Sequence, residues 1–168
     1  MKIKLLTICL LLFTSQAFPE EKVEFFDFVY MCINGVSNAK YLGRDFKIAG
    51  AQDINEDNPF KNELDERGYK GMLFAKNNKK IILYFGEVFD RGKKVGACGV
   101  ITDDEDYNYI FNKLKNGYDI KLVDTIKMGP GVQYVYSVRT GGDTTLGIQA
   151  LNNKENGPLR YDILEYID

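Results

Sequence analysis

Residues 72–102 read MLFAKNNKKIILYFGEVFDRGKKVGACGVIT, and the expected architecture follows from this stretch. Three apolar runs, 72–76, 81–89 and 95–102, are separated by two short polar turns. In the middle run both alternating sets of side chains are apolar: Ile81, Leu83, Phe85 and Phe89, and Ile82, Tyr84 and Val88. A strand that is apolar on both sides usually lies inside a sheet with two covered faces. Because short Asn- and Gly-containing turns join antiparallel strands, the stretch predicts consecutive hairpins around a central strand.

A helix and further strands are expected after this stretch. Residues 102–105 read TDDE, a capping box in which the Thr102 hydroxyl accepts a bond from a backbone N–H of the first turn. The helix is predicted to end at Gly117, and its buried stripe is Tyr107, Ile110, Phe111 and Leu114. Strands are predicted over 120–127, 132–139 and 144–151. Residues 159–167 form a last strand or helix, which periodicity does not distinguish.

The chain before this stretch is expected to begin with a helix. Apolar residues recur at three- and four-residue spacing over 23–42, which predicts one helix with a buried face. Gly43 is predicted to end this helix, and Asn34-Gly35 weakens its middle. Residues 46–49 are predicted as a short strand, and 52–68 as a long polar loop with room for one helical turn.

Together these segments predict an α+β fold. We expect a single antiparallel sheet of about six to eight strands, with the N-terminal helix and the mid-chain helix packed on one face. The chain has 168 residues, a length that suits one domain with a substantial core. No linker or internal repeat divides it, so residues 18–168 are expected to form a single globular domain.

The first 17 residues have the pattern of a secretory signal peptide. Lys2 and Lys4 precede a short apolar run, and Ser15 and Ala17 provide the small residues before a cleavage site. The alternative is a membrane anchor, but the apolar run of roughly 10 residues is shorter than the ~20 that span a bilayer. We therefore expect a periplasmic or secreted protein, with no transmembrane segment in the mature chain.

Export determines how the cysteines are interpreted. Removal of residues 1–17 would take away Cys9 and leave Cys32 and Cys98. Two cysteines in an exported chain indicate one disulfide bond, and the alternative is two separate buried thiols. Catalytic thiol chemistry is disfavoured, because no histidine is present to activate either sulfur.

Composition excludes several classes of function. The chain has 22 basic and 24 acidic residues, a formal net charge of −2 and no histidine. This balance argues against a nucleic-acid-binding protein with a broad basic surface. Without histidine there is no Ser-His-Asp triad and no imidazole-based zinc site. We predict no cofactor and no nucleic-acid partner.

One loop resembles the start of an EF-hand calcium loop in its spacing of oxygen ligands: Asp53, Asn55 and Asp57. The pattern then departs from the motif. Asn58 stands where the sharp turn needs glycine, and Leu64 stands where the motif needs a bidentate glutamate. These residues are weak metal-ligand candidates, and a solvated loop is the alternative.

Two carboxylates interrupt apolar strand faces and are weak catalytic candidates. Alternation places Glu87 on a face with apolar neighbours, and Asp124 likewise. Two such acids across a sheet would be the minimum equipment of a glycosidase. The alternatives are a β-bulge that turns either acid to solvent, or neutralisation by Arg91 or Lys127 at a strand end.

Two further groups are weak binding candidates. Tyr134 and Tyr136 alternate along one strand face, where aromatic rings bind partners, although such rings are more often half-buried core. Two acidic stretches are alternatives for contact with a basic partner: the first turn of the mid-chain helix, with Asp103, Asp104 and Asp106, or the loop over 53–57.

These observations favour a non-catalytic binding or inhibitory protein of the cell envelope. An immunity-type protein that blocks a toxin or lytic enzyme fits the compact size, the negative charge and the cysteine pair, and its partner would be another envelope protein. One alternative is a carboxylate-dependent hydrolase that acts on a glycan through Glu87 and Asp124 or Asp90. The other is a carrier that holds a small ligand between helix and sheet.

Overall fold

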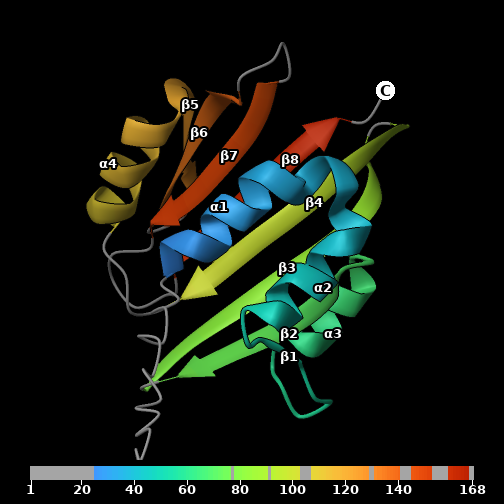
Figure 1. Cartoon of the computed structure of the whole chain (residues 1–168). Coiled ribbons are helices and arrows are strands. Elements are labelled where there is room, and N and C mark those ends of the chain that lie inside the picture. Colours follow the sequence, from blue (N-terminus) through green and yellow to red (C-terminus); the bar gives the residue numbers. More distant parts are fainter. Residues whose placement is uncertain are drawn as a thin grey trace, which may run out of the picture.

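The structure is a computed structural model, which describes residues 25–76, 78–90, 92–102, 107–128, 131–140, 145–152 and 159–166. In these residues eight strands form one sheet in the order β1-β2-β3-β4-β8-β7-β6-β5 (Figure 1). All its neighbouring strands are antiparallel. The strands are β1 (Gln52–Asp53), β2 (Lys70–Lys76), β3 (Lys79–Asp90), β4 (Lys93–Thr102), β5 (Asp119–Met128), β6 (Gly131–Arg139), β7 (Thr145–Asn152) and β8 (Leu159–Tyr166).

Helices precede each of two strand meanders. The helical elements are α1 (Phe25–Gly35), the 3-10 turn η1 (Val36–Asn38), α2 (Ala39–Ile48), α3 (Lys61–Glu66) and α4 (Tyr107–Gly117). The predicted α+β class, antiparallel sheet and N-terminal helix are confirmed. The first meander runs β2-β3-β4 and the second β5-β6-β7-β8, and their last strands, β4 and β8, pair at the middle of the sheet.

Helices α1, α2 and α4 cover one face of the sheet, which we call the helix face (Figure 1). One row of paired residues runs across this face through Cys98 of β4, Ile163 of β8 and Tyr136 of β6. Cys98 is bonded to Cys32 of α1, and the Tyr136 ring lies 4.9 Å from that of Phe111 in α4. Both helices therefore lie on the same side, as predicted for the N-terminal and mid-chain helices.

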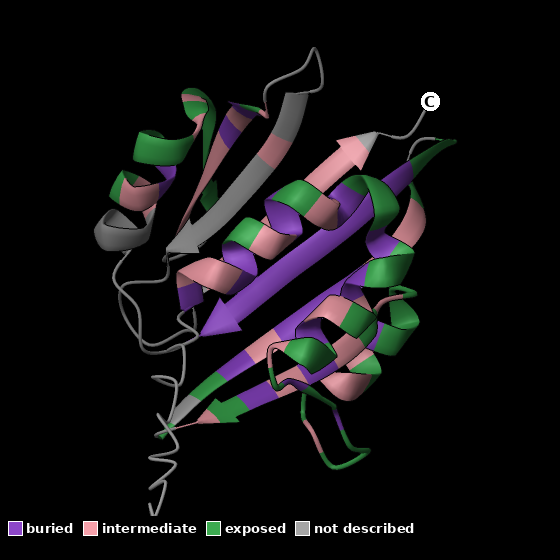
Figure 2. Cartoon of the chain, in the orientation of Figure 1, coloured by how far each residue is buried: buried purple, intermediate pink, exposed green. Residues whose placement is uncertain are grey.

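The main core lies between these helices and the sheet. Phe28 of α1 packs edge-on against Phe46 of α2, which packs in turn against Phe85 of β3. Residues 95–102 of β4 are buried throughout, so this strand is purple along most of its length in Figure 2. The core is thus thickest over the middle of the sheet, where the two meanders meet.

The opposite face, which we call the rear face, carries a smaller apolar cluster under α3. Leu64 of α3 packs there with Ile54, Tyr84 and Ile101. Because Tyr84 pairs with Gly99, next to Cys98, its side chain lies on the face opposite the disulfide. Of the described helices, α3 is the one that covers this face.

The first helical segment differs from the prediction in two ways. The helix breaks at Gly35, where Asn34-Gly35 has a low helix propensity. It then resumes as α2 and continues to Ile48. The predicted end at Gly43 and the predicted strand over 46–49 are therefore wrong. A Cβ atom at Gly43 would lie 2.6 Å from Cζ of Phe85, so this glycine permits close helix-to-sheet packing instead of ending the helix.

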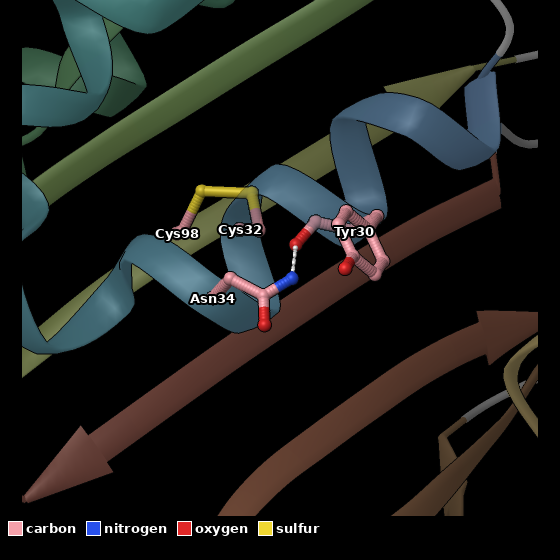
Figure 3. The surroundings of a disulfide bond; sticks show 4 residues. All are labelled: Tyr30, Cys32, Asn34 and Cys98. Carbon is pink, nitrogen blue, oxygen red and sulfur yellow. Dashed lines mark hydrogen bonds between the residues drawn. A yellow bond between two sulfur atoms is a disulfide. The ribbon is translucent and has the colours of Figure 1, made fainter. Parts of the chain in front are cut away.

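The predicted cysteine pair forms a disulfide bond between α1 and β4 (Figure 3). The Cα atoms of Cys32 and Cys98 are 5.4 Å apart, and both side chains are buried. Nearby, the Asn34 amide donates to the backbone oxygen of Tyr30 at 2.9 Å (Figure 3).

Over the described residues, the helices all fall short of the length and apolarity that a membrane crossing requires. Residues 1–17, predicted as a signal peptide, lie outside the described residues.

Candidate functional site

The two carboxylates predicted as catalytic candidates make different contacts. Glu87 is half-buried on β3, and its Oε2 lies 2.6 Å from Nζ of Lys94. Asp124 is exposed on β5, and its Oδ1 accepts a hydrogen bond from the backbone N–H of Thr125 at 2.7 Å. Each carboxylate thus has its own local partner.

The sheet order also keeps these two acids apart. Strands β4, β8, β7 and β6 lie between β3 and β5. With a spacing of about 4.8 Å per strand, Glu87 and Asp124 are separated by roughly 24 Å. The two carboxyl groups of a glycosidase are about 5 to 10 Å apart. The structure therefore does not bring this pair into one cleft.

A β-bulge explains the exposure of Asp124. The register shifts between Leu122 and Asp124, and Val123 is the extra residue. Leu122 pairs with Tyr136 and so lies on the helix face, whereas Asp124 pairs with Val135, on the rear face. Strict alternation predicted one shared face for Leu122 and Asp124, and this is wrong because the bulge reverses the alternation.

The tyrosines predicted as binding candidates belong to the core. Tyr136 is 6% exposed, and its ring lies against Phe111 of α4. Tyr134 is half-buried, and its ring centroid lies 6.5 Å from that of Tyr136. The structure therefore supports the alternative interpretation, in which both rings are packing residues of the helix face.

The predicted acidic and metal-ligand candidates are placed as follows. Asp53 is exposed on β1, where its carboxylate accepts a bond from Nζ of Lys47 at 2.8 Å. Asn55 uses its backbone oxygen to accept a bond from the N–H of Asn58, and Asp57 is exposed. Across the described ranges, side chains of His, Cys, Asp and Glu form no group that would hold a metal ion. Three acids lie outside the described residues: Asp103, Asp104 and Asp106.

A charged cluster that the sequence did not predict joins α3 to the sheet on the rear face. Arg160 of β8 donates through Nε to the Tyr84 hydroxyl at 3.0 Å and to Oδ1 of Asp162 at 3.1 Å. A second guanidinium nitrogen donates to Oε1 of Glu63 in α3 at 3.3 Å. Arg67 contacts the same Glu63 oxygen at 3.1 Å. We call these five residues the Arg160 cluster.

The Arg160 cluster depends on a glycine in β4. Tyr84 of β3 and Asp162 of β8 pair with Gly99 from its two sides. A Cβ atom at Gly99 would overlap the Tyr84 ring. The missing side chain thus lets Tyr84 lie across β4 and reach Arg160, whose guanidinium carbon is 5.0 Å from the ring centroid.

Burial changes the acid–base behaviour of the Arg160 cluster. The Asp162 side chain is 16% exposed, and burial raises the pKa of its carboxyl from the ordinary 3.8 to about 7. The Arg67 charge acts to lower this pKa, and the Glu63 charge acts to raise it. In a chain without histidine, Asp162 is thus a group that exchanges a proton near neutral pH.

The same region is net negative, although the rest of the full chain is net positive. Residues 53–66, which we call the acidic segment, run from β1 to the end of α3 and contain six acids and one lysine. The segment has a net charge of −5, whereas the rest of the full chain carries +3. The Glu56 side chain is 86% exposed and that of Asp53 72% exposed. Among the acids that the structure describes, the exposed ones are thus concentrated at one edge of the sheet.

The acidic segment is held to the sheet at several points. Leu64 is buried in the rear-face cluster, and Glu63 is held by Arg160 and Arg67. Lys61 forms ion pairs with Asp65 and with Glu56.

No family model, curated protein or solved structure matches the chain. The function is therefore inferred from the geometry of the described residues.

Proposed function

We propose that this protein is an exported, non-catalytic binding protein of inhibitory type, which presents the acidic segment to a basic surface of another envelope protein. The observation that carries the proposal is the acidic segment itself, an exposed region of net charge −5 anchored to a folded sheet. The buried disulfide supports export, because disulfides persist in oxidising compartments.

Anchoring matters because a rigid surface binds with a smaller loss of conformational entropy than a flexible one. Leu64 and Glu63 fix α3, while exposed acids such as Asp57 and Glu66 remain available to a partner. A concentrated negative charge speeds the encounter with a positive partner and orients it on approach. We therefore expect the protein to discriminate between partners mainly through the rate of association.

The geometry gives less support to the carboxylate-dependent hydrolase. That activity requires two acids on either side of one scissile bond, and Glu87 and Asp124 lie on strands separated by four others. Glu87 is also paired with Lys94. The binding function does not need these two residues to meet.

The experiment uses a purified peptidoglycan-cleaving enzyme with a basic isoelectric point as the probe. The test variant carries Asp57→Asn and Glu66→Gln, two exposed positions in the acidic segment. The control carries Asp45→Asn and Asp119→Asn, which remove the same charge elsewhere, at one half-buried and one exposed position. We expect the test variant to associate roughly tenfold more slowly and to inhibit less, because steering depends on local charge.

The control variant should associate and inhibit like the wild type. Equal loss in both variants would show that total charge, and not the acidic segment, governs binding. Unchanged binding and inhibition by the test variant would contradict the proposal.

A further inference from the structure

Strand β5 forms one edge of the sheet and carries exposed apolar side chains. Among the described residues its one strand partner is β6. Leu122, Val123 and Ile126 are 51%, 64% and 42% exposed. A ten-residue edge strand with unpaired backbone groups offers a template for another strand.

The bulge restricts which registers such an added strand could adopt. Residues that pair in an antiparallel ladder have side chains on the same face. On β5, positions 120, 122 and 125 lie on the helix face, whereas 119, 121, 124 and 126 lie on the rear face. Two copies of β5 match face for face when the two-fold axis passes between Leu122 and Val123.

In this register the strand is complementary to itself. Lys121 of one copy lies opposite Asp124 of the second copy, and the pair occurs twice because of the two-fold symmetry. Leu122 lies opposite Val123, so two exposed apolar residues of the strand meet at the axis. Opposite charges placed directly across a ladder stabilise strand pairing.

We infer that β5 is the interface of a homodimer, in which two sheets join edge to edge through antiparallel pairing centred between Leu122 and Val123. The occupant of this edge is therefore a second copy of the chain. The inference is independent of the acidic segment, which lies at the other edge of the sheet, next to β1 and β2. A dimer would present two acidic segments at its far ends.

The test measures mass by sedimentation equilibrium over about 1 to 500 µM, the range that suits a small interface. Lys121→Glu alone places like charges opposite each other, and Asp124→Lys alone does the same with the opposite sign. Each variant should raise the dimer dissociation constant by roughly tenfold or more, because like charges across an interface are unfavourable. A mixture of the two variants should form a heterodimer, since the introduced glutamate then faces the introduced lysine and the retained Lys121 faces the retained Asp124.

Lys127→Glu is the matched control, because it makes the same charge change on the same strand. In the proposed register Lys127 lies opposite the neutral Tyr118, so this variant should dimerise like the wild type. Should one single variant fail to fold, the double variant Lys121→Glu with Asp124→Lys restores both pairs within a homodimer and gives the same test. A wild-type protein that stays monomeric over the whole range, or a mixture that forms no heterodimer, overturns the inference.

Discussion

Burial of the Asp162 carboxyl group makes the free energy of unfolding depend on pH. Its pKa is about 7 in the folded protein and near 3.8 when exposed. Between these values the folded state binds more protons than the unfolded state, so the free energy of unfolding falls as the pH rises from about 4 to 7. We predict that Asp162→Asn removes this fall, which amounts to about 2–3 kcal/mol between pH 5 and pH 8.

The measurement is urea unfolding of both proteins at pH 5 and pH 8. Asp57→Asn, an exposed carboxylate of the acidic segment, serves as the control and should keep the wild-type dependence. If the wild type and Asp162→Asn lose equal stability between the two pH values, the raised pKa of Asp162 is contradicted.

Sequence reasoning at the residue scale succeeded where a residue type has few possible roles. Cys32 and Cys98 were predicted to pair because two cysteines in an exported chain usually form a disulfide bond in an oxidising compartment. The Arg160 cluster was missed for a different reason. In β8, Arg160 and Asp162 alternate with the buried Tyr161 and Ile163. Periodicity did not distinguish a strand from a helix over these residues, and it does not show which strands lie beside them.

At the scale of the element, the disulfide joins α1 to β4 across 66 residues of sequence. The bond limits the conformations of the unfolded chain, which in the chain-entropy model stabilises a loop of this length by about 4 kcal/mol. We predict that a reducing agent lowers the free energy of unfolding by up to this amount. Chemical denaturation with and without reductant measures it.

The double variant Cys32→Ser with Cys98→Ser is the control, since it should be destabilised and insensitive to reductant. Equal stability of the wild type in both conditions, with both thiols shown to be free after reduction, would contradict the prediction.

Hydrophobic periodicity predicted most elements but not their interruptions. The strands over 72–102 and the helix that ends at Gly117 were predicted closely, because their apolar patterns are long and regular. Gly43 was misread, since a glycine that ends a helix and one that admits the Phe85 ring look alike in sequence. The bulge at Val123 was one of two alternatives for Asp124, and local sequence did not distinguish them.

At the scale of the whole molecule, the sequence predicted antiparallel neighbours but not the pairing of β4 with β8. Hairpins follow from adjacent runs and short turns, whereas β4 and β8 are distant in the chain and join through tertiary packing. That join places α3 next to β8 and so creates the Arg160 cluster. Residues 52–68 were predicted as a polar loop with room for one helical turn. The attachment of the acidic segment to the sheet depends on the same long-range contact.

The most direct test of the binding function is carboxyl footprinting by mass spectrometry, with and without the basic peptidoglycan-cleaving enzyme. Exposed carboxylates react with a carbodiimide and an amine, and a bound partner protects those that it covers. We expect Glu56, Asp57 and Glu66 to be protected in the complex, with Asp45 and Asp119 labelled as in the free protein. Labelling of the acidic segment that is unchanged in a complex shown to be intact would contradict this expectation.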